Sequence, residues 1–258
     1  MSRGSTVSPA AVENLNSALA SSRELPVRLT LIAASVAPGR ITFSTSLGME
    51  DQAVLHAIAQ SKATIDIFTL ETGRHFPETL ETLQASEHRY GLKIRAVYPD
   101  ARELEALVGN IGINGFRQSV DNRKACCEVR KVHPLNRALV GAAGWITGLR
   151  REQSAGRNAV PFAERDASTG MIKLNPIADW TLAQLEAYIA ANDIPINALH
   201  ARGFPSIGCQ PCTRAIKPGE DIRAGRWWWE NEDGKECGLH NRPANASTAS
   251  SRATGAPA

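Results

Sequence analysis

Hydrophobic stretches alternate with amphipathic ones along most of this chain, and that order predicts strands alternating with helices. Five short apolar runs have the length and composition of strands: residues 41–44, 65–70, 92–98, 145–148 and 171–174. Helical spacing follows the first run over about residues 49–60, recurs after Pro77, and returns from Asp179 or Thr181 through Ile189. Strands separated by helices indicate an α/β fold with a mostly parallel sheet, whose binding loops lie at the carboxyl ends of the strands.

The two ends of the chain depart from this alternation. We expect residues 1–25 to form an N-terminal tail or helix and residues 26–200 to form the α/β domain that carries the binding loops. Residues 201–240, rich in loops, cysteine and tryptophan, are expected to be a C-terminal extension laid over the binding edge of the sheet. Residues 241–258 have the composition of a disordered tail.

Composition excludes several classes of protein. The net charge of +3 over 258 residues is too small for a general nucleic-acid binder. No apolar run is long enough to cross a membrane, and the first residues lack the apolar segment of a secretory signal. We therefore expect a cytoplasmic protein, in which cysteines serve as metal ligands or redox catalysts more often than as structural disulfides.

Four of the five cysteines form two close pairs, Cys126 with Cys127 and Cys209 with Cys212. Neighbouring cysteines on a helix point about 100° apart, so both reach one metal cluster more easily than one zinc ion. An iron–sulfur cluster is the first interpretation, a four-cysteine zinc site the second, and packed thiols the third. The helix that carries the tandem pair is expected to break at Pro134, with His133 forced out of helical geometry.

The fifth cysteine, Cys237, lies in a short polar segment near the C-terminal end. Lys235 and His240 favour its thiolate, although Glu236 opposes them. An incidental surface thiol is the alternative. Upstream of it, Arg223 and Arg226 suit a sulfate or phosphate, and three consecutive tryptophans, residues 227–229, are expected to anchor the root of the tail.

Two loops that follow predicted strands carry anion-binding chemistry. Residues 44–51 offer hydroxyls and backbone N–H groups at the start of a helix, although Glu50 and Asp51 compete for the same helix dipole. A capped strand–helix turn explains this spacing equally well. In the second loop, Gly148 would let a nucleotide approach the backbone, and Arg157 or Arg151 could hold an anion.

Four motifs occurring in order, at residues 126–127, 206–213, 225–230 and 235–240, identify a family resemblance. From about residue 41 to residue 240 the chain resembles the thioredoxin-dependent assimilatory adenylyl-sulfate (APS) reductases of the phosphoadenylyl-sulfate reductase family. The loop at residues 44–51 also resembles the modified phosphate loop of the adenine-nucleotide α-hydrolase-like superfamily. Thr45 and Leu47 stand where the ATP-splitting members carry consecutive glycines, which favours a nucleotide that is bound without pyrophosphate cleavage.

The resemblance implies a Rossmann-like sheet with a mobile C-terminal segment, and an enzyme of sulfate assimilation and cysteine biosynthesis. It implies a [4Fe–4S] cluster on the four paired cysteines, Cys126, Cys127, Cys209 and Cys212. Cys237 would attack the sulfur of adenosine 5′-phosphosulfate to give a cysteine S-sulfonate and AMP, and thioredoxin would release sulfite. The positions that match nucleotide or sulfate contacts are Ser44, Ser46, Lys131, Gly148, Arg157, Arg223 and Arg226. A homo-oligomer is compatible with this interpretation.

Lys131, one turn beyond the tandem cysteines, could face both an anionic cluster and a bound sulfate. Three alternatives remain. The nearest is reduction of phosphoadenylyl sulfate (PAPS), although relatives specific for that substrate typically lack the two cysteine pairs. The others are a cluster-containing sulfur transferase that acts on nucleic acid and consumes ATP, and a zinc-stapled binding module with no enzymatic activity.

Overall fold

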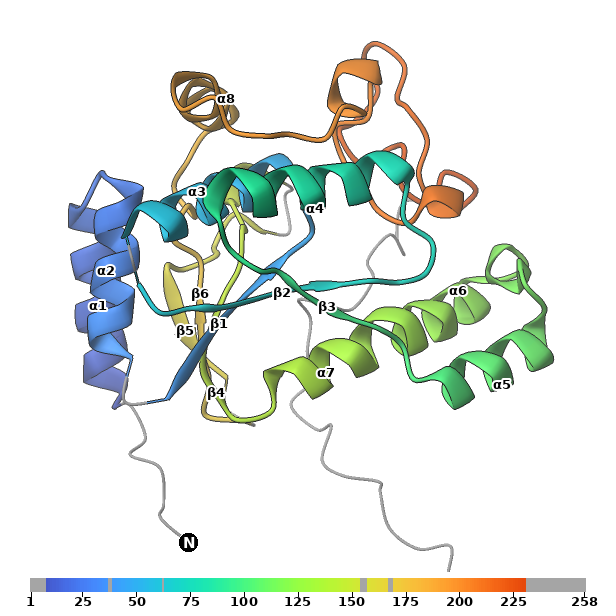
Figure 1. Cartoon of the computed structure of the whole chain (residues 1–258), viewed down its shortest axis with the longest axis horizontal. Helices are drawn as coiled ribbons and strands as arrows, with labels where there is room; N and C mark the ends of the chain where they lie inside the picture. The colour runs from blue at the N-terminus through green and yellow to red at the C-terminus, as the bar shows by residue number, and fades with distance from the viewer. Residues whose placement is uncertain (1–7, 37–38, 62, 154–156, 167–168, 231–258) are drawn as a thin grey trace, which may run out of the picture.

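A six-stranded sheet forms the centre of the protein, as the computed structural model shows for residues 8–230 apart from 37–38, 62, 154–156 and 167–168 (Figure 1). The strands are β1 (Arg40–Thr45), β2 (Asp66–Leu70), β3 (Arg95–Val97), β4 (Ala142–Ile146), β5 (Ala163–Arg165) and β6 (Ile172–Leu174). Their order is β3-β2-β1-β4-β6-β5, and every neighbouring pair is parallel except β5 with β6. The predicted α/β class and mostly parallel sheet are confirmed.

Four of the predicted strands are in place, and β4 is shifted toward the N-terminus, so that Thr147 and Gly148 lie in the loop after it. Strand β5 was missed by the sequence analysis. It spans only three residues, and both Glu164 and Arg165 are exposed, so it lacks the apolar alternation that marks a strand.

Helices cover both faces of the sheet. Helices α3 (Met49–Ser61) and α4 (Pro77–Tyr90) lie on one face, where α1 (Pro9–Ser21) and α2 (Leu25–Ser35) join the same core (Figure 1). Helices α5 (Ala101–Ile111), α6 (Val120–Cys127) and α7 (His133–Leu139) connect β3 to β4, and α7 packs on the other face. Helix α8 (Leu182–Ala191) packs against α3, and Thr181 begins it with a capping box. No helix in the described ranges is long and apolar enough to cross a membrane.

The strand order creates a crevice between β1 and β4. The chain steps from β1 to β2 to β3 in one direction and then returns to place β4 on the other side of β1. The connections that leave the carboxyl ends of β1 and β4 therefore diverge. In open α/β sheets such a switch point is where ligands bind.

The helix that carries the tandem cysteines does not break at Pro134, so that expectation is wrong. Residues Glu128–Val132 widen into a π-helical turn, and the backbone N–H of His133 reaches the carbonyl of Glu128 five residues back. His133 itself has helical angles, φ −61° and ψ −48°. Because proline lacks an N–H and clashes with the carbonyl four residues earlier, the wider turn lets the helix continue past it.

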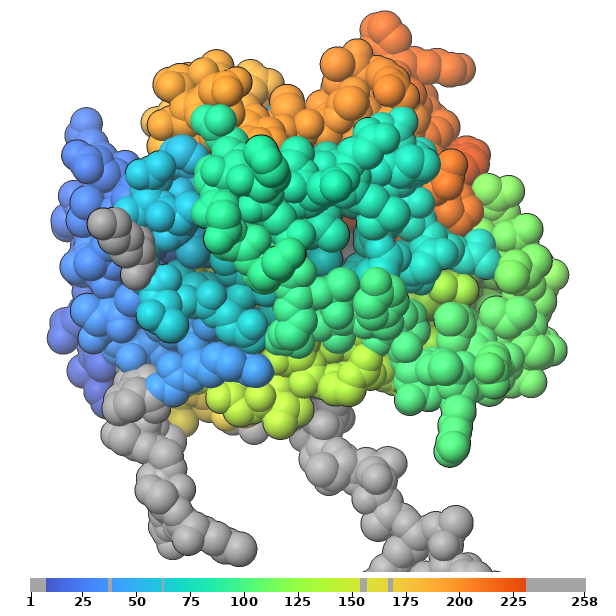
Figure 2. Space-filling view, in the orientation of Figure 1, coloured from blue at the N-terminus to red at the C-terminus, as the bar shows by residue number. Residues whose placement is uncertain are grey.

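The segment after α8 lies across the top of the sheet's carboxyl edge, against α4 and α6 (Figures 1 and 2). It is largely irregular, and hydrogen bonds, ion pairs and ring contacts hold it against earlier elements. The N–H of Gln210 donates to the Arg74 carbonyl at 2.8 Å, and Arg117 donates to the Pro211 carbonyl at 3.0 Å. At its end, Arg123 and Glu230 form an ion pair at 2.8 Å, with side chains only 1% and 3% exposed.

The predicted anchoring role of the tryptophan block is confirmed for Trp227 and Trp229. Trp227 is 1% exposed and lies between the guanidinium groups of Arg123 and Arg226, at 4.6 and 4.8 Å from its ring centre. Trp229 packs against Phe116, with ring centres 6.1 Å apart. Cys237 and the tail at residues 241–258 lie outside the described residues.

Removing the buried anion that fixes this segment should destabilise the protein. In Glu230→Ala, Arg123 loses its ion-pair partner while still buried, so we expect the free energy of unfolding to fall by about 3 kcal/mol in urea denaturation. The matched control is Glu164→Ala, which removes a half-exposed partner of Lys173 and should cost less than about 1 kcal/mol. Equal losses in the two variants would contradict the anchoring role of the buried pair.

Candidate functional site

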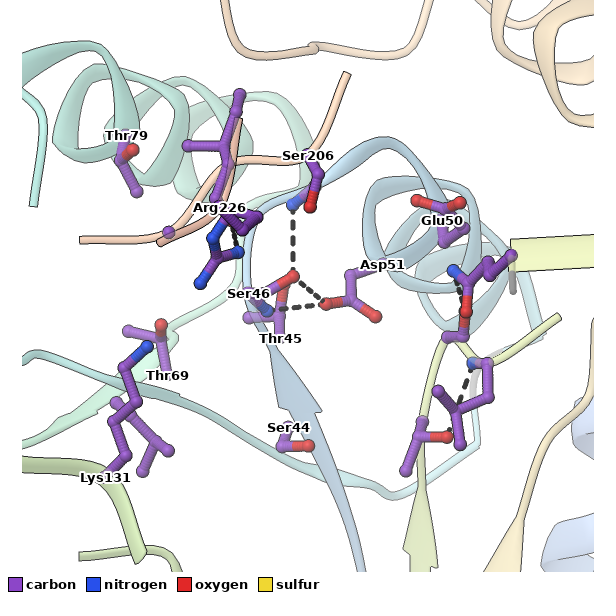
Figure 3. A pocket seen from close by; sticks show the side chains of 18 of the residues that line it. Ser44, Thr45, Ser46, Glu50, Asp51, Thr69, Thr79, Lys131, Ser206 and Arg226 are labelled. Atoms are coloured by element: carbon purple, nitrogen blue, oxygen red, sulfur yellow. Dashed lines mark hydrogen bonds between the residues drawn. The ribbon is translucent and has the colours of Figure 1, made fainter. Parts of the chain in front are cut away.

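A cavity of about 250 Å³ opens at the switch point (Figure 3). Its walls come from the ends of β1, β2 and β4, the loops that follow them, and the irregular C-terminal segment. All seven residues that the sequence analysis assigned to nucleotide or sulfate line it: Ser44, Ser46, Lys131, Gly148, Arg157, Arg223 and Arg226. The structure therefore brings into one place residues that are up to 182 positions apart in sequence (226 − 44).

The loop after β1 is held by a buried carboxylate. Asp51 accepts hydrogen bonds from the backbone N–H of Ser46 at 2.6 Å and from its hydroxyl at 2.5 Å (Figure 3). Burial raises the pKa of Asp51 to about 6, although the Ser46 bonds act in the opposite direction. Leu47 adopts a left-handed φ of 62° to make this turn. Both donors of Ser46 are thus engaged by Asp51, and the role of Ser46 in this arrangement is to fix the loop.

Gly148 allows this carboxylate to approach. A Cβ atom at position 148 would lie 2.3 Å from Oδ1 of Asp51 and 3.1 Å from the Cβ of Glu50. The sequence suggests that Gly148 lets a nucleotide approach the backbone, whereas in the described residues the close approach is made by a side chain of α3. Glu50 itself is bound by buried Arg150 at 2.9 Å. The two acidic residues at the start of α3 therefore join β1 to β4.

Ser44 and Arg157 face the cavity with defined partners. The indole N–H of Trp145 donates to Oγ of Ser44 at 2.8 Å, which leaves the hydroxyl proton of Ser44 for another acceptor. Arg157 donates to Oε1 of Gln153 at 2.5 Å, and both residues line the cavity. Arg151, the alternative anion holder, instead donates to the Val160 carbonyl and lies over the ring of Phe162.

The four paired cysteines line a second, small cavity next to the first. None of them forms a disulfide. Basic residues surround the thiols: Arg74, Arg123, Arg130 and Lys131 line the same space. Lys131 and Trp227 line both cavities and so form their common wall. Across the described ranges, no group of three or more histidine, cysteine or acidic side chains is arranged to hold a metal ion.

The environment separates the cysteines by acidity. Burial opposes ionisation of Cys209, but Lys131, a hydrogen bond with Thr72 and Arg226 outweigh it and lower its pKa. Burial and the neighbouring Cys209 raise the pKa of Cys212 to about 12. Burial also raises the pKa of Cys126, which Arg130 opposes.

Two buried arginines that line these cavities, Arg130 at the smaller and Arg226 at the larger, have no carboxylate partner among the described residues. Arg28, Arg123 and Arg150 are buried and each forms an ion pair with an acidic side chain. Arg130 and Arg226 are only 6% and 7% exposed, yet neither forms an ion pair with any acidic side chain between residues 8 and 230 that the structure describes. The Nε atom of each is buried without a hydrogen-bond partner there. Because buried charges are normally compensated, this arrangement is suited to anions that enter the two cavities.

Residues 40–215 match the family model described as phosphoadenosine phosphosulfate reductase domain. The chain belongs to this family. Adenosine 5′-phosphosulfate reductase of Agrobacterium fabrum is 52% identical over 93% of this chain and 91% of its own length. The enzyme of that name from Allochromatium vinosum is 50% identical over 78% of this chain and 79% of its own.

A solved structure is also similar to this chain. The phosphoadenylyl-sulfate reductase of Candida auris, in a phosphate complex, superimposes with a TM-score of 0.69 at 26% identity, covering 83% of this chain and all of that one. The likeness confirms the predicted Rossmann-like fold of the adenine-nucleotide α-hydrolase-like type.

Several residues that line the larger cavity were not predicted from the sequence. Thr69 lies near the carboxyl end of β2 and Thr72 lies just beyond it, and both line the cavity. A signal existed for them, because ligands bind at the carboxyl ends of parallel strands. His75 and His200 also line it, each with one buried ring nitrogen that has no partner in the described chain. No signal marked His200, which lies in a short 3₁₀ turn within the irregular C-terminal segment.

A methyl group at position 148 should displace Asp51, which holds the loop at the larger cavity. Gly148→Ala would overlap Oδ1 of Asp51, which is buried and cannot move without breaking its Ser46 bonds, so we expect a loss of about 1–3 kcal/mol in the free energy of unfolding. The same substitution at Gly109, in the interior of α5 with nothing within 4 Å, should raise stability by about 0.5–1 kcal/mol. If Gly148→Ala unfolds at the wild-type denaturant concentration, the close approach does not constrain position 148.

Proposed function

We propose that this protein reduces adenosine 5′-phosphosulfate to sulfite and AMP, with thioredoxin as the reductant. The observation that carries the proposal is a pair of neighbouring cavities, one lined by Arg226 and the other by Arg130 and four thiols, because these two buried arginines form no ion pair with any acidic side chain that the structure describes. Relatives about 50% identical, which carry the name adenosine 5′-phosphosulfate reductase, support the same substrate.

The larger cavity would bind the substrate with its anionic end toward the thiols. Lys131, Arg223 and Arg226 would hold the sulfate, because they are the cations that line the cavity on the side of the cysteines or the C-terminal segment. Ser44 and Arg157 would bind nearer the phosphate and nucleoside, with the loop kept in position by the contacts of Asp51 to Ser46 and Gly148. Fixed cations suit this reaction, since a thiolate that attacks a sulfate group adds charge to an anionic centre.

The smaller cavity would hold a [4Fe–4S] cluster on Cys126, Cys127, Cys209 and Cys212. Four cysteine ligands are the donor set of such a cluster, and the surrounding arginines and Lys131 would offset its negative charge. When bound, the cluster supplies a fixed negative charge beside the substrate pocket. Lys131, which lines both cavities, would then be positioned by the thiolates while it contacts the sulfate.

Cys237 would be the nucleophile. Its thiolate attacks the sulfur of the substrate, a bond forms between Sγ and that sulfur, and the bond from sulfur to the phosphate oxygen breaks, so that AMP leaves with the electron pair. One thiol of reduced thioredoxin then attacks Sγ of Cys237 and expels sulfite, and its second thiol resolves the mixed disulfide. The two electrons come from the thioredoxin dithiol.

Four described cysteines without a disulfide suit a reducing compartment, and we place the reaction in the cytoplasm.

The intermediate provides the sharpest test. Intact protein incubated with adenosine 5′-phosphosulfate should gain the mass of one SO₃ group, located at Cys237 by peptide mapping and removed by reduced thioredoxin. Cys237→Ser should form no adduct and release no sulfite, yet keep its iron. Cys209→Ser is the matched control, and it should lose iron because Cys209 is a proposed ligand.

Two results would contradict the proposal. One is an adduct on any cysteine of the two pairs, and the other is loss of iron in Cys237→Ser. Turnover measured at equal concentrations of adenosine 5′-phosphosulfate and phosphoadenylyl sulfate shows which of the two is the preferred substrate. A higher kcat/KM for the 3′-phosphorylated nucleotide would make this protein a phosphoadenylyl-sulfate reductase instead.

A further inference from the structure

His200 is fixed as a hydrogen-bond acceptor at the wall of the larger cavity. Its Nδ1 lies 2.9 Å from the backbone carbonyl oxygen of Phe204. A carbonyl can only accept, so Nδ1 carries the proton of the ring. Burial lowers the pKa of His200, which keeps the imidazole neutral at physiological pH. The second ring nitrogen, Nε2, is therefore an unprotonated acceptor.

That acceptor has no partner within the described residues. Nε2 of His200 is buried, and no donor of residues 8–230 that the structure describes reaches it. A buried acceptor left unsatisfied is costly, and such groups usually find a partner in a ligand or an ordered water. His200 lines the cavity, whose anion-binding side is made of donors such as Lys131 and Arg226. An acceptor among donors points to a ligand that itself carries a donor.

The proposed substrate limits which group this donor can be. The phosphosulfate moiety offers only acceptor oxygens at neutral pH, so the donor belongs to the nucleoside, as a ribose hydroxyl or the amine of the base. His200 is close enough to Glu50, in the first turn of α3, for that carboxylate to favour its protonated form. The loop that follows β1 lines the same cavity, and in the proposed binding mode the ribose and the 5′-phosphate would lie near it.

We infer that Nε2 of His200 accepts a hydrogen bond from a ribose hydroxyl of the bound nucleotide, an assignment that rests on the proposed function. His200 is thus a residue that determines specificity for the substrate of the reaction. The same lone pair opposes a phosphate on the hydroxyl that it binds, because a phosphate monoester presents acceptor oxygens and negative charge to it. The geometry thereby provides a physical reason for preferring an unphosphorylated ribose.

Two substitutions separate this role from a structural one. In His200→Asn, the side-chain amide can replace Nδ1 and still donate to the Phe204 carbonyl, but it offers nothing at the position of Nε2. In His200→Gln, the longer side chain can place its amide oxygen near the position of Nε2. A structural role alone predicts that Asn is tolerated and Gln is not, whereas an acceptor role predicts the reverse.

The experiment is calorimetric titration of the full-length, cluster-containing protein with AMP, the product of the proposed reaction. We expect His200→Asn to lose about five- to tenfold in affinity for AMP and His200→Gln to lose less. In turnover, the KM of His200→Asn for adenosine 5′-phosphosulfate should rise by a similar factor with kcat little changed. His133→Asn, the same substitution at an exposed ring bound to Glu103 on the far side of the sheet, should match the wild type.

Nucleotide analogues identify the atom that is bound. Wild-type protein should bind either 2′-deoxy-AMP or 3′-deoxy-AMP about five- to tenfold more weakly than AMP, and His200→Asn should bind that analogue and AMP equally. The assignment is wrong if His200→Asn binds AMP as tightly as the wild type does. It is also wrong if His200→Asn loses as much affinity between AMP and each deoxy analogue as the wild type loses, because the substitution and the missing hydroxyl would then act independently. Inosine monophosphate lacks the amine of the base. If His200→Asn removes only the difference in affinity between AMP and inosine monophosphate, the contact is to the base amine and the ribose assignment is overturned. If the wild type does not bind AMP at all, the proposed function itself fails.

Discussion

The compensation of buried positive charge is the constraint on which this structure depends. Three buried arginines that build the fold are matched by carboxylates, and they join α2 to the loop before α8, β4 to α3, and α6 to the end of the described chain. Arg130 and Arg226 are also buried, Arg130 at the smaller cavity and Arg226 at the larger one, and they have no such match in the described part. Within the described residues these two guanidinium groups are therefore suited to anions that enter the cavities.

The fold places the two cavities next to each other. Strand order puts the ends of β1 and β4 side by side and opens the larger cavity there, while the connection from β3 to β4 carries the tandem cysteines toward the same edge. The π-helical turn then adds a residue before Pro134 and aligns Lys131 with both cavities. The C-terminal segment completes the wall with Arg226 and Cys209, and it is held by Trp227 and the Arg123–Glu230 pair. Binding and anchoring therefore share the same few side chains.

Much of the site could be predicted from the sequence, because its chemistry lies in residue types whose spacing is unusual. Paired cysteines, a polar loop after a buried strand and an arginine–tryptophan block each carry a local signal, and the structure gathers their side chains around two cavities. What could not be predicted depends on contacts between distant segments. The reason for glycine at position 148 is a carboxylate on α3, and the acceptor on His200 exists only because the Phe204 carbonyl fixes its proton. The break expected at Pro134 failed because a single extra residue in the turn removes the clash that local rules anticipate.

The proposed [4Fe–4S] cluster in the smaller cavity is the claim on which the remainder depends. The metal content of the protein tests that claim most directly. Protein isolated without exposure to oxygen should contain about four iron atoms and about four acid-labile sulfides per chain, together with the broad visible absorbance of thiolate-bound iron. The buried guanidinium groups of Arg130 and Arg226 would then lie near a negative charge, with Lys131 lining the same cavity as the cluster. Colourless protein with one zinc ion per chain, or with no metal at all, would contradict the account.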